Sequence, residues 1–404
     1  MHTTDALHAG SIRSDADAMK EWLVSVRRAL HEYPELGNEE FVTADRIGQE
    51  LSSLGISYER TDTAIVGIVR GVTEGKTVGL RADIDALPIQ EATGLPFASK
   101  NAGHMHACGH DAHTTILLGC ARWFSEHREH FSGAVKLFFQ PAEESSGGAE
   151  IMVSRGCLAN PTVDHVFGLH VMPYLPVGEV EVKYGTLNGC STGVTITVHG
   201  KSGHGAYPET GVDAILVASE LVIALNTLVS RRVSPLDSAV FSVGKIQGGV
   251  RTNIIADEVT LSATLRAGTD ELRDRMIGYI RNMVDGVCAA HGAQGTVDIR
   301  YGYAALVNHD AEVDMVCRTA ERILGPGSVQ WKEKPSMGVE DFSFFIRDTP
   351  GAFYHLGCAP EGFSPGDAFY PLHSDCFILN EDCLPVGVAM QTALTIEALG
   401  GHVS

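Results

Sequence analysis

The chain has 404 residues, of which 44% are hydrophobic and 20% are charged, and its mean hydropathy is +0.04. This length suggests two or three domains with a large buried core, and the composition argues against a disordered or a membrane-spanning protein. The formal net charge of −20 opposes phosphate backbones and anionic lipids. We therefore expect a small-molecule ligand, and no nucleic-acid or membrane partner.

Targeting and redox signals point to a cytoplasmic location. We expect no apolar run to approach the length of a bilayer span, and the N-terminal stretch has no basic segment followed by an apolar one, as a secretory signal would. The nine cysteines are an odd number scattered over a long chain, unlike the dense framework of a small secreted protein. Most of them are expected to be buried thiols.

The first third of the chain predicts helices alternating with buried strands. Apolar residues from Met19 to Leu30 recur at helical spacing, and Pro34 and Gly37 end that helix. Strand-like runs follow at 77–85, 134–144 and 164–173, with helices after residue 114 and from about Ala149. This rhythm is typical of an α/β domain with a mostly parallel sheet covered by helices.

The middle third has a different pattern. Strand-like runs at 194–200, 239–246, 258–267 and 296–301 surround helix-like runs at 211–229 and 270–292. The order is β-α-β-β-α-β, which is typical of a ferredoxin-like domain. The α/β pattern then resumes with a helix at 312–324, a strand at 351–358 and a final helix at 385–399. We expect a catalytic domain of residues 1–184 and 302–404 with a smaller domain, residues 185–301, inserted in it.

Side chains that can bind metals gather at the ends of the predicted strands. They are Asp83 and Asp85, Glu143 and Glu144, His170, and, in front of a helix, Cys108 with His110. In an open α/β sheet, ligands bind beyond the carboxyl ends of the strands, so groups far apart in sequence can meet there. The combination of Asp, Glu, His and Cys predicts a metal site at this edge.

Each of these residues also has a simpler explanation. An exposed turn accounts for Asp83 and Asp85 taken alone, and a solvated helix start accounts for the two glutamates. A lone buried histidine such as His170 is more often part of the core than a ligand. The segment "HACGHD" is the strongest signal, because Cys108 and His110 fit no zinc-finger spacing yet can reach one ion from an extended loop.

Three further histidines surround this segment. His104, His106 and His113 are predicted to support the ligands or the fold rather than to bind metal. Cys108 taken alone would most often be an inert buried thiol. The flanking histidines make a ligand the better interpretation.

These motifs resemble those of the peptidase M20 amidohydrolases, in the branch of hippurate hydrolases, N-acyl-amino-acid aminohydrolases and auxin-conjugate hydrolases. The resemblance spans nearly the whole chain. The matching segments are "LHEYPELGNEE", "LRADIDALPI", "MHACGHDAHT", "FQPAEE", "GLHVMP", "GHGAYPETGVDAI", "GGVRTNIIADEVTLSATLR", "SMGVEDFSFF" and "YPLHSD". The fold it implies is a zinc-peptidase-like α/β domain with an inserted ferredoxin-like domain for dimerisation or for covering the site.

The resemblance also implies residue roles. Two divalent ions would be held by Cys108, His110, Glu144, His170 and His373. Glu143 would be the general base, and Asp85 would support the site. Relatives outside this branch use a histidine and a bridging aspartate where this chain has Asp83 and "HACGH", so the group that bridges the two ions stays open.

In the inserted domain, the resemblance implies substrate-binding roles. His204 would reach the active site of a partner subunit and contact the substrate or its developing oxyanion, while Asn253 and Arg266 would bind the carboxylate end of the substrate. Without the resemblance, a turn histidine, a loop cap and a solvated strand arginine would be the preferred interpretations. A homodimer or a dimer of dimers follows from these roles.

The chemistry expected of this site is amide hydrolysis. Two ions that hold one water lower its pKa and polarise the amide oxygen, and Glu143 carries the proton to the leaving amine. A Cys108 thiolate favours zinc, with manganese, cobalt or nickel as alternatives. The expected substrates are N-acyl-amino acids. The alternatives are an aminopeptidase or dipeptidase with the same metals and, less favoured because Glu143 is a spare base, a metal-binding protein without catalysis.

Overall fold

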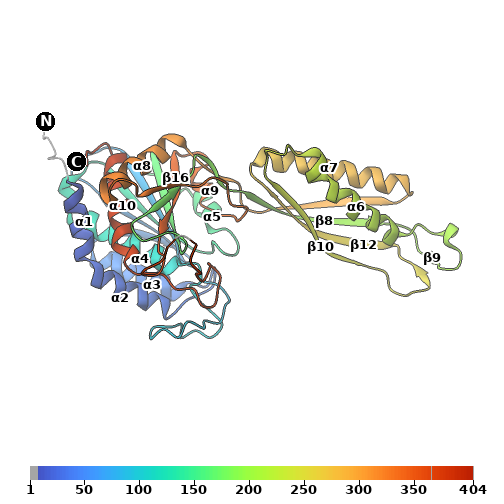
Figure 1. The fold of residues 1–404 in the computed structure, drawn as a ribbon, viewed down its shortest axis with the longest axis horizontal. Coiled ribbons are helices and arrows are strands. Elements are labelled where there is room, and N and C mark those ends of the chain that lie inside the picture. The colour runs from blue at the N-terminus through green and yellow to red at the C-terminus, as the bar shows by residue number, and fades with distance from the viewer. Residues whose placement is uncertain (1–7, 365, 404) are drawn as a thin grey trace. The chain divides into compact units, whose positions relative to one another are not determined.

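The computed structural model describes residues 8–364 and 366–403, and it divides into two compact units. Unit 1 comprises Met1–Gly185, Val307–Glu333 and Asp341–Ser404, and unit 2 comprises Thr186–Leu306 and Lys334–Glu340. Two short strands, β7 (Gly185–Asn188) and β14 (Leu306–Asn308), pair where the chain passes between the units. Figure 1 shows the elements of each unit.

Unit 1 is built around one eight-stranded sheet. In spatial order its strands are β1 (Ser57–Thr61), β2 (Ala64–Arg70), β4 (Ala134–Gln140), β3 (Thr77–Asp83), β5 (His165–Met172), β16 (Gly351–Gly357), β6 (Val180–Val182) and β15 (Val329–Trp331). The four strands from β4 to β16 are parallel, whereas β1, β2 and β6 pair antiparallel with neighbours. The predicted α/β class is confirmed, and the sheet is mixed at its two ends.

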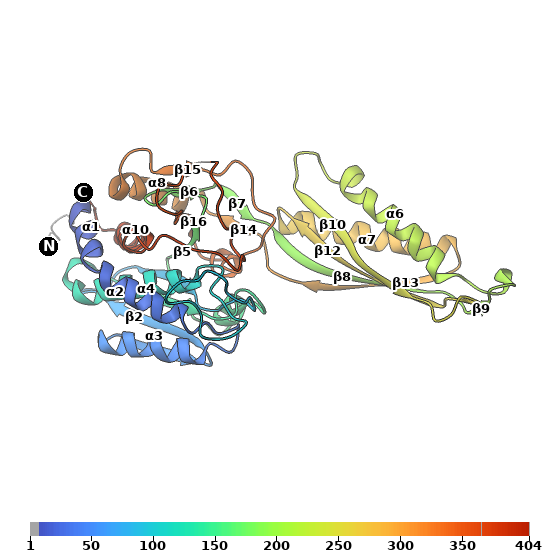
Figure 2. The same cartoon turned by 60° about the horizontal axis from the view of Figure 1, so that its bottom comes forward.

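Helices cover both faces of this sheet. They are α1 (Ala9–Ala18), α2 (Lys20–His31), α3 (Phe41–Ser53), α4 (His110–Glu126), α5 (Gly148–Ser154), α8 (Asp310–Leu324), α9 (Ser343–Ile346) and α10 (Cys383–Ala398), with a short 3₁₀ turn at Arg128–His130. Helices α3, α4, α8 and α10 lie on one face, and α1 and α2 pack outside α4 and α10 (Figure 2). Helices α5 and α9 pack together on the other face.

The two faces of β4 show why this strand is buried on both sides. Val135, Leu137 and Phe139 join the large core beneath α4, and they alternate with residues that face α5 and α9. On that second face, Phe138 stacks on Phe345 with ring centroids 5.2 Å apart. A parallel strand with helices on both faces reads as a continuous apolar run, which is the pattern that the sequence predicted.

Unit 2 has the predicted β-α-β-β-α-β order. Its main elements are β8 (Cys190–His199), α6 (Ala214–Arg232), β10 (Ala239–Gly248), β12 (Glu258–Ala267), α7 (Asp270–Ala290) and β13 (Gln294–Tyr301). The four strands form an antiparallel sheet in the order β10-β12-β8-β13, with α6 and α7 on one face (Figure 1). A small ladder of β9 (Gly203–His204) and β11 (Ile254–Ile255) and a 3₁₀ turn at Pro208–Thr210 complete the unit. The ferredoxin-like order is confirmed.

The prediction that no apolar segment approaches a bilayer span was wrong for α6. This 19-residue helix is long and apolar enough, by length and composition, to cross a membrane. One side of it, including Val217, Leu221 and Leu225, belongs to the hydrophobic core of unit 2. Packing against the sheet therefore explains the apolar residues on this side, whereas others such as Leu216 and Ile223 are exposed.

A buried arginine organises the carboxyl end of the central strands in unit 1. The Arg81 guanidinium donates to Gln140 Oε1 at 2.7 Å, to Asp83 Oδ2 at 2.7 Å and to Asp341 Oδ1 at 2.8 Å. Gln140 also donates to both carboxylate oxygens of Asp341. All three charged side chains of this network are fully shielded from solvent. It ties β3 and β4 to the segment in front of α9.

Removing this guanidinium should destabilise unit 1 strongly. We expect Arg81→Met to lower the free energy of unfolding by about 3–5 kcal/mol, because two buried carboxylates lose their counter-charge. The matched control is Arg13→Met, which breaks an exposed pair with Asp17 and should cost about 1 kcal/mol or less. All three tryptophans lie in unit 1, so urea unfolding of metal-free protein followed by tryptophan fluorescence reports on this unit. Equal losses in the free energy of unfolding of the two variants would show that the buried Arg81 network stabilises unit 1 no more than an exposed ion pair does.

Candidate metal centre

The loop before α4 brings Cys108 and His110 to the sheet edge. Gly109, between them, has a φ of 85°, and a Cβ atom there would lie 2.5 Å from Val171 Cγ2. Only glycine fits this left-handed position without strain. The turn places Cys108 Sγ 3.3 Å from Nε2 of His170, at the carboxyl end of β5. Both side chains are buried.

His110 begins α4 and is oriented by Asp85. Its Nδ1 lies 3.0 Å from the backbone oxygen and 3.1 Å from Oδ1 of Asp85. Its Nε2 is buried without a hydrogen-bond partner in the described part of the chain, 3.6 Å from Asp83 and 3.9 Å from Glu144. A buried imidazole nitrogen that faces two carboxylates in this way is suited to a cation.

His373 reaches the same place from the loop before α10. Its backbone N–H donates to Ala107 O at 2.8 Å, which fixes this loop beside Cys108. Its Nε2 lies 3.1 Å from Oε1 of Glu144. The loop is thereby positioned by its backbone, and the half-exposed imidazole is free to turn toward Glu144.

The five predicted ligands form two overlapping groups. In Cys108, His110 and His170, the ligand atoms all lie within 4.8 Å of one another, and the same holds for Cys108, Glu144 and His373. Glu143 lies within the same distance of His110 and Glu144. Cys108 belongs to both groups, so the two groups are close enough to hold two adjacent ions. The donor set of sulfur, nitrogen and oxygen fits divalent metals of the zinc type.

The electrostatics of this cluster favour a bound cation. Burial lowers the pKa of His110, but Asp83 and Asp85 outweigh this effect and raise it to about 10. Burial raises the pKa of Cys108 well above its usual value, and the carboxylates of Glu144 and Glu143 raise it further. The carboxylates contribute in the same direction to both shifts, which indicates a negative potential at the cluster that a divalent cation would compensate.

His113, predicted to be a supporting residue, lies outside the two ligand groups that share Cys108, but it forms a further candidate metal group with Asp83 and His110. His113 lies 2.6 Å from Asp83 Oδ1 through Nδ1, and its Nε2 accepts a hydrogen bond of 2.9 Å from the N–H of Val171. Both ring nitrogens are thus occupied, and burial lowers the pKa of His113. Arg81, which also holds Asp83, was not among the predicted residues, although an arginine inside a buried strand was a visible signal.

The residues predicted to bind substrate lie in unit 2. His204, in β9, is exposed, and its Nδ1 accepts from the N–H of Ala206 at 3.0 Å. Asn253 is close to it, because its carbonyl accepts from Gly205 at 2.9 Å. Arg266, in β12, has a buried Nη1 without a hydrogen-bond partner among the described residues. Their roles in binding stay predictions.

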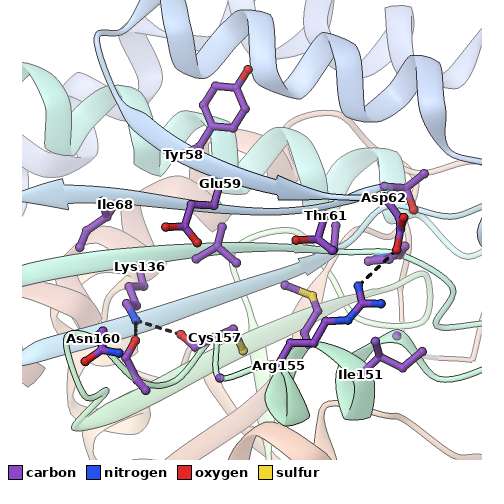
Figure 3. Close-up of a pocket in the computed structure, with 18 of the residues that line it drawn as sticks. Tyr58, Glu59, Thr61, Asp62, Ile68, Lys136, Ile151, Arg155, Cys157 and Asn160 are labelled. Atoms are coloured by element: carbon purple, nitrogen blue, oxygen red, sulfur yellow. Dashed lines mark hydrogen bonds and ion pairs between the residues drawn. The ribbon is translucent and has the colours of Figure 1, made fainter.

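A separate cavity of about 640 Å³ lies on the α5 side of the sheet in unit 1 (Figure 3). Lys136 closes one wall by donating to the backbone oxygens of Cys157, at 2.9 Å, and Ala159. Arg155 pairs with Asp62 on the other side. None of the predicted metal ligands lines this cavity. The candidate metal centre therefore lies outside this cavity.

Known proteins share this fold and these motifs. The model of "Peptidase family M20/M25/M40" matches residues 79–397. A thermostable carboxypeptidase of Saccharolobus solfataricus is 35% identical over 96% of this chain and 98% of its own length, and a hippurate hydrolase of Campylobacter jejuni is 35% identical over 93% and 96%. A solved Bacillus subtilis structure, described as a dinuclear metal-binding peptidase from the M20 family, is 31% identical with a TM-score of 0.82, covering 95% of this chain and 99% of its own. The resemblance noted in the sequence is thus confirmed, and the chain belongs to peptidase family M20/M25/M40.

Proposed function

We propose that the protein hydrolyses the amide bond of N-acyl-amino acids, releasing a carboxylic acid and a free amino acid. The observation that carries this proposal is the pair of ligand groups that share Cys108, with Glu143 beside them. Two divalent cations held there would polarise an amide carbonyl and lower the pKa of a water molecule. The ligands proposed are Cys108, His110, Glu144, His170 and His373.

Glu143 is the proposed general base. It lies next to the proposed ligand Glu144, in the turn that follows β4. A carboxylate that does not bind metal can take a proton from the attacking water and deliver it to the nitrogen of the leaving amine. Asp85 supports this arrangement, because it holds both His110 Nδ1 and, at 2.9 Å, the backbone N–H of Glu144.

The substrate class is supported by the names of the relatives. A carboxypeptidase and a hippurate hydrolase both cleave an amide next to a free carboxylate. This chemistry favours N-acyl-amino acids over an aminopeptidase substrate, which would need an acidic group to bind a free amine. The carboxypeptidase relative makes short peptides with a free C-terminus the second candidate. Zinc is the proposed metal because of the sulfur ligand, with manganese, cobalt or nickel as alternatives.

Substitutions of the neighbouring residues Glu143 and Glu144 should have different effects. We expect wild-type protein and Glu143→Gln to bind about two divalent ions per chain, and Glu143→Gln to lose about 10²–10⁴-fold in kcat. Glu144→Gln removes a charged ligand and should weaken metal affinity by about tenfold or more. Glu150→Gln, on the surface of α5, is the control carboxylate. Metal titration by calorimetry and elemental analysis tests this, and near-normal kcat in Glu143→Gln would reassign the base.

Unit 2 is proposed to supply the carboxylate-binding residues. Arg266 offers a planar guanidinium that forms bidentate hydrogen bonds with carboxylates, and its unpartnered Nη1 is consistent with a ligand. Asn253 is proposed to assist it. His204 is proposed to contact the developing oxyanion in the site of a partner subunit.

Loss of Arg266 should be selective for the charged substrate. Arg266→Ala should lower kcat/KM on N-benzoylglycine far more than on its carboxamide, because only the acid forms the charge-assisted pair. Arg300→Ala removes an exposed arginine from the neighbouring part of the same sheet and is the matched control. Equal losses on acid and carboxamide would show that Arg266 does not recognise the carboxylate.

A homodimer in the cytoplasm is part of the proposal. The outer side of α6 exposes Leu216 and Ile223, with 56% and 72% of their surface accessible, and β10 is an edge strand of its sheet. Such apolar surface beside an unpaired strand edge is suited to a second copy of the chain. The nine cysteines are all free thiols, which suits a reducing compartment.

Charge on the exposed side of α6 should prevent this association. The wild-type protein should elute at the mass of a dimer or larger assembly in light scattering coupled to gel filtration. The double variant Leu216→Glu, Ile223→Glu should be monomeric, whereas Ile151→Glu, an exposed apolar residue of unit 1, should not change the mass. A monomeric wild-type protein would exclude this part of the proposal.

A further inference from the structure

The residue in front of the two glutamates has an unusual backbone conformation. Ala142 has a φ of 58°, in the left-handed region that alanine rarely adopts. Asn38, Asp62 and Asn160 share a positive φ, but their polar side chains tolerate it. Ala142 has no such side chain, so the surrounding structure must hold it. Any change of its φ rotates the chain that follows, and Glu143 is the next residue.

A buried carboxylate holds this turn in place. Glu40 Oε1 accepts a hydrogen bond of 2.8 Å from the backbone N–H of Ala142. The carbonyl of Ala142 accepts from Gly147 at 3.0 Å and from Ser145 at 3.4 Å. Two residues along, Asp85 accepts from the N–H of Glu144. The turn is thus fixed at both ends by carboxylates, one on each side of Glu143.

The side chain of Glu40 does not cap the helix that it precedes. It occupies the N-cap position of α3, yet its side chain makes no capping hydrogen bond there. It is fully buried and forms no ion pair in residues 8–364 and 366–403. Burial raises the pKa of Glu40. The bond from Ala142 to Oε1 and the nearby Thr63 offset part of this desolvation cost, while Oε2 makes no hydrogen bond among the described residues.

The segment that carries Glu40 is itself rigidly attached. Glu35 accepts hydrogen bonds from Val42 and Thr43 at the start of α3, and its carbonyl accepts from Ala86, next to Asp85. Gly37 lies against the turn, where a Cβ atom would be 3.0 Å from Ala142 Cα and 2.3 Å from Ser145 Oγ. The segment 35–40 therefore contacts both the Asp85 loop and the glutamate turn.

We propose that Glu40 is a positioning residue that holds Ala142 in its left-handed conformation and thereby aims Glu143 at the scissile amide. This inference rests on the proposed role of Glu143 as general base. The proposed role needs the hydrogen bond that Glu40 accepts from the backbone N–H of Ala142, and it does not need the negative charge of Glu40. The proposal therefore separates two properties of one side chain, its ability to accept a hydrogen bond and its negative charge.

Four variants test the proposal. Glu40→Met fills the volume but cannot hold the N–H of Ala142, so kcat should fall by about 10²-fold, with KM and metal content little changed. Glu40→Gln keeps an oxygen acceptor and should stay within about threefold of the wild type. Ala142→Gly alone is the reference for the double variant, which combines Glu40→Met with Ala142→Gly. The double variant should regain about tenfold or more in kcat over Glu40→Met, because glycine adopts this φ without strain.

Hydrogen exchange gives a readout that does not need activity. The amides of Ser145 and Gly147 should exchange faster in Glu40→Met than in the wild type, and the double variant should restore their protection. If Glu40→Met does not fold, Glu40→Ala replaces it in both measurements. A wild-type protein inactive on N-acyl-amino acids would refute the proposed function. The exchange data would then still show whether Glu40 holds the turn at Ala142. Impairment of Glu40→Gln equal to that of Glu40→Met, or no rescue by glycine, would overturn the inference.

Discussion

Compensation of buried negative charge at one end of the sheet is the constraint on which the site depends. Asp83, Asp85 and Asp341 all lie beneath the surface of unit 1, where an isolated carboxylate is unstable. Arg81 neutralises two of them, and the histidines of α4 bind Asp83 and Asp85. The carboxylates of Glu144 and Glu143 face Cys108 and raise the pKa of its thiol, so the negative potential is felt at the place where cations would bind.

The same constraint divides the histidines by function. Both ring nitrogens of His113 form hydrogen bonds, one with Asp83 and one with Val171, so this side chain connects α4 to β5. His110, one turn earlier on the same helix, has one nitrogen held by Asp85 and the other unpartnered. Two side chains of the same chemical type, three residues apart, thus differ because one has a free nitrogen and the other does not. Orientation by a second acceptor is the usual way to prepare a histidine ligand.

Sequence patterns predicted those parts of the molecule that depend on local periodicity. The long apolar strands β3, β4, β5 and β16 and the alternating order of unit 2 were found because burial imposes a period of two or a continuous apolar run. The helix α3 and the strands β1 and β2 were not predicted; β1 is exposed throughout and lacks an apolar signal. Nor did the sequence show that residues 334–340 belong to unit 2, because that assignment depends on tertiary contacts.

The candidate site was predictable in composition but not in geometry. Strand ends and the segment "HACGHD" pointed to four of the candidate ligands, and the resemblance added His373. The left-handed backbone of Ala142 and its hydrogen bond to Glu40, in contrast, cannot be read from a sequence such as "QPAEE". The discontinuous make-up of unit 1 has a consequence for its synthesis. Unit 2 is almost complete once residue 306 is made, but β5 has no β16 beside it, and α4 has no α10, until the last 54 residues (351–404) follow. During synthesis on the ribosome, unit 2 can therefore fold first, while the sheet of unit 1 still exposes the unpaired edge of β5. At this stage the chain would depend most on chaperones.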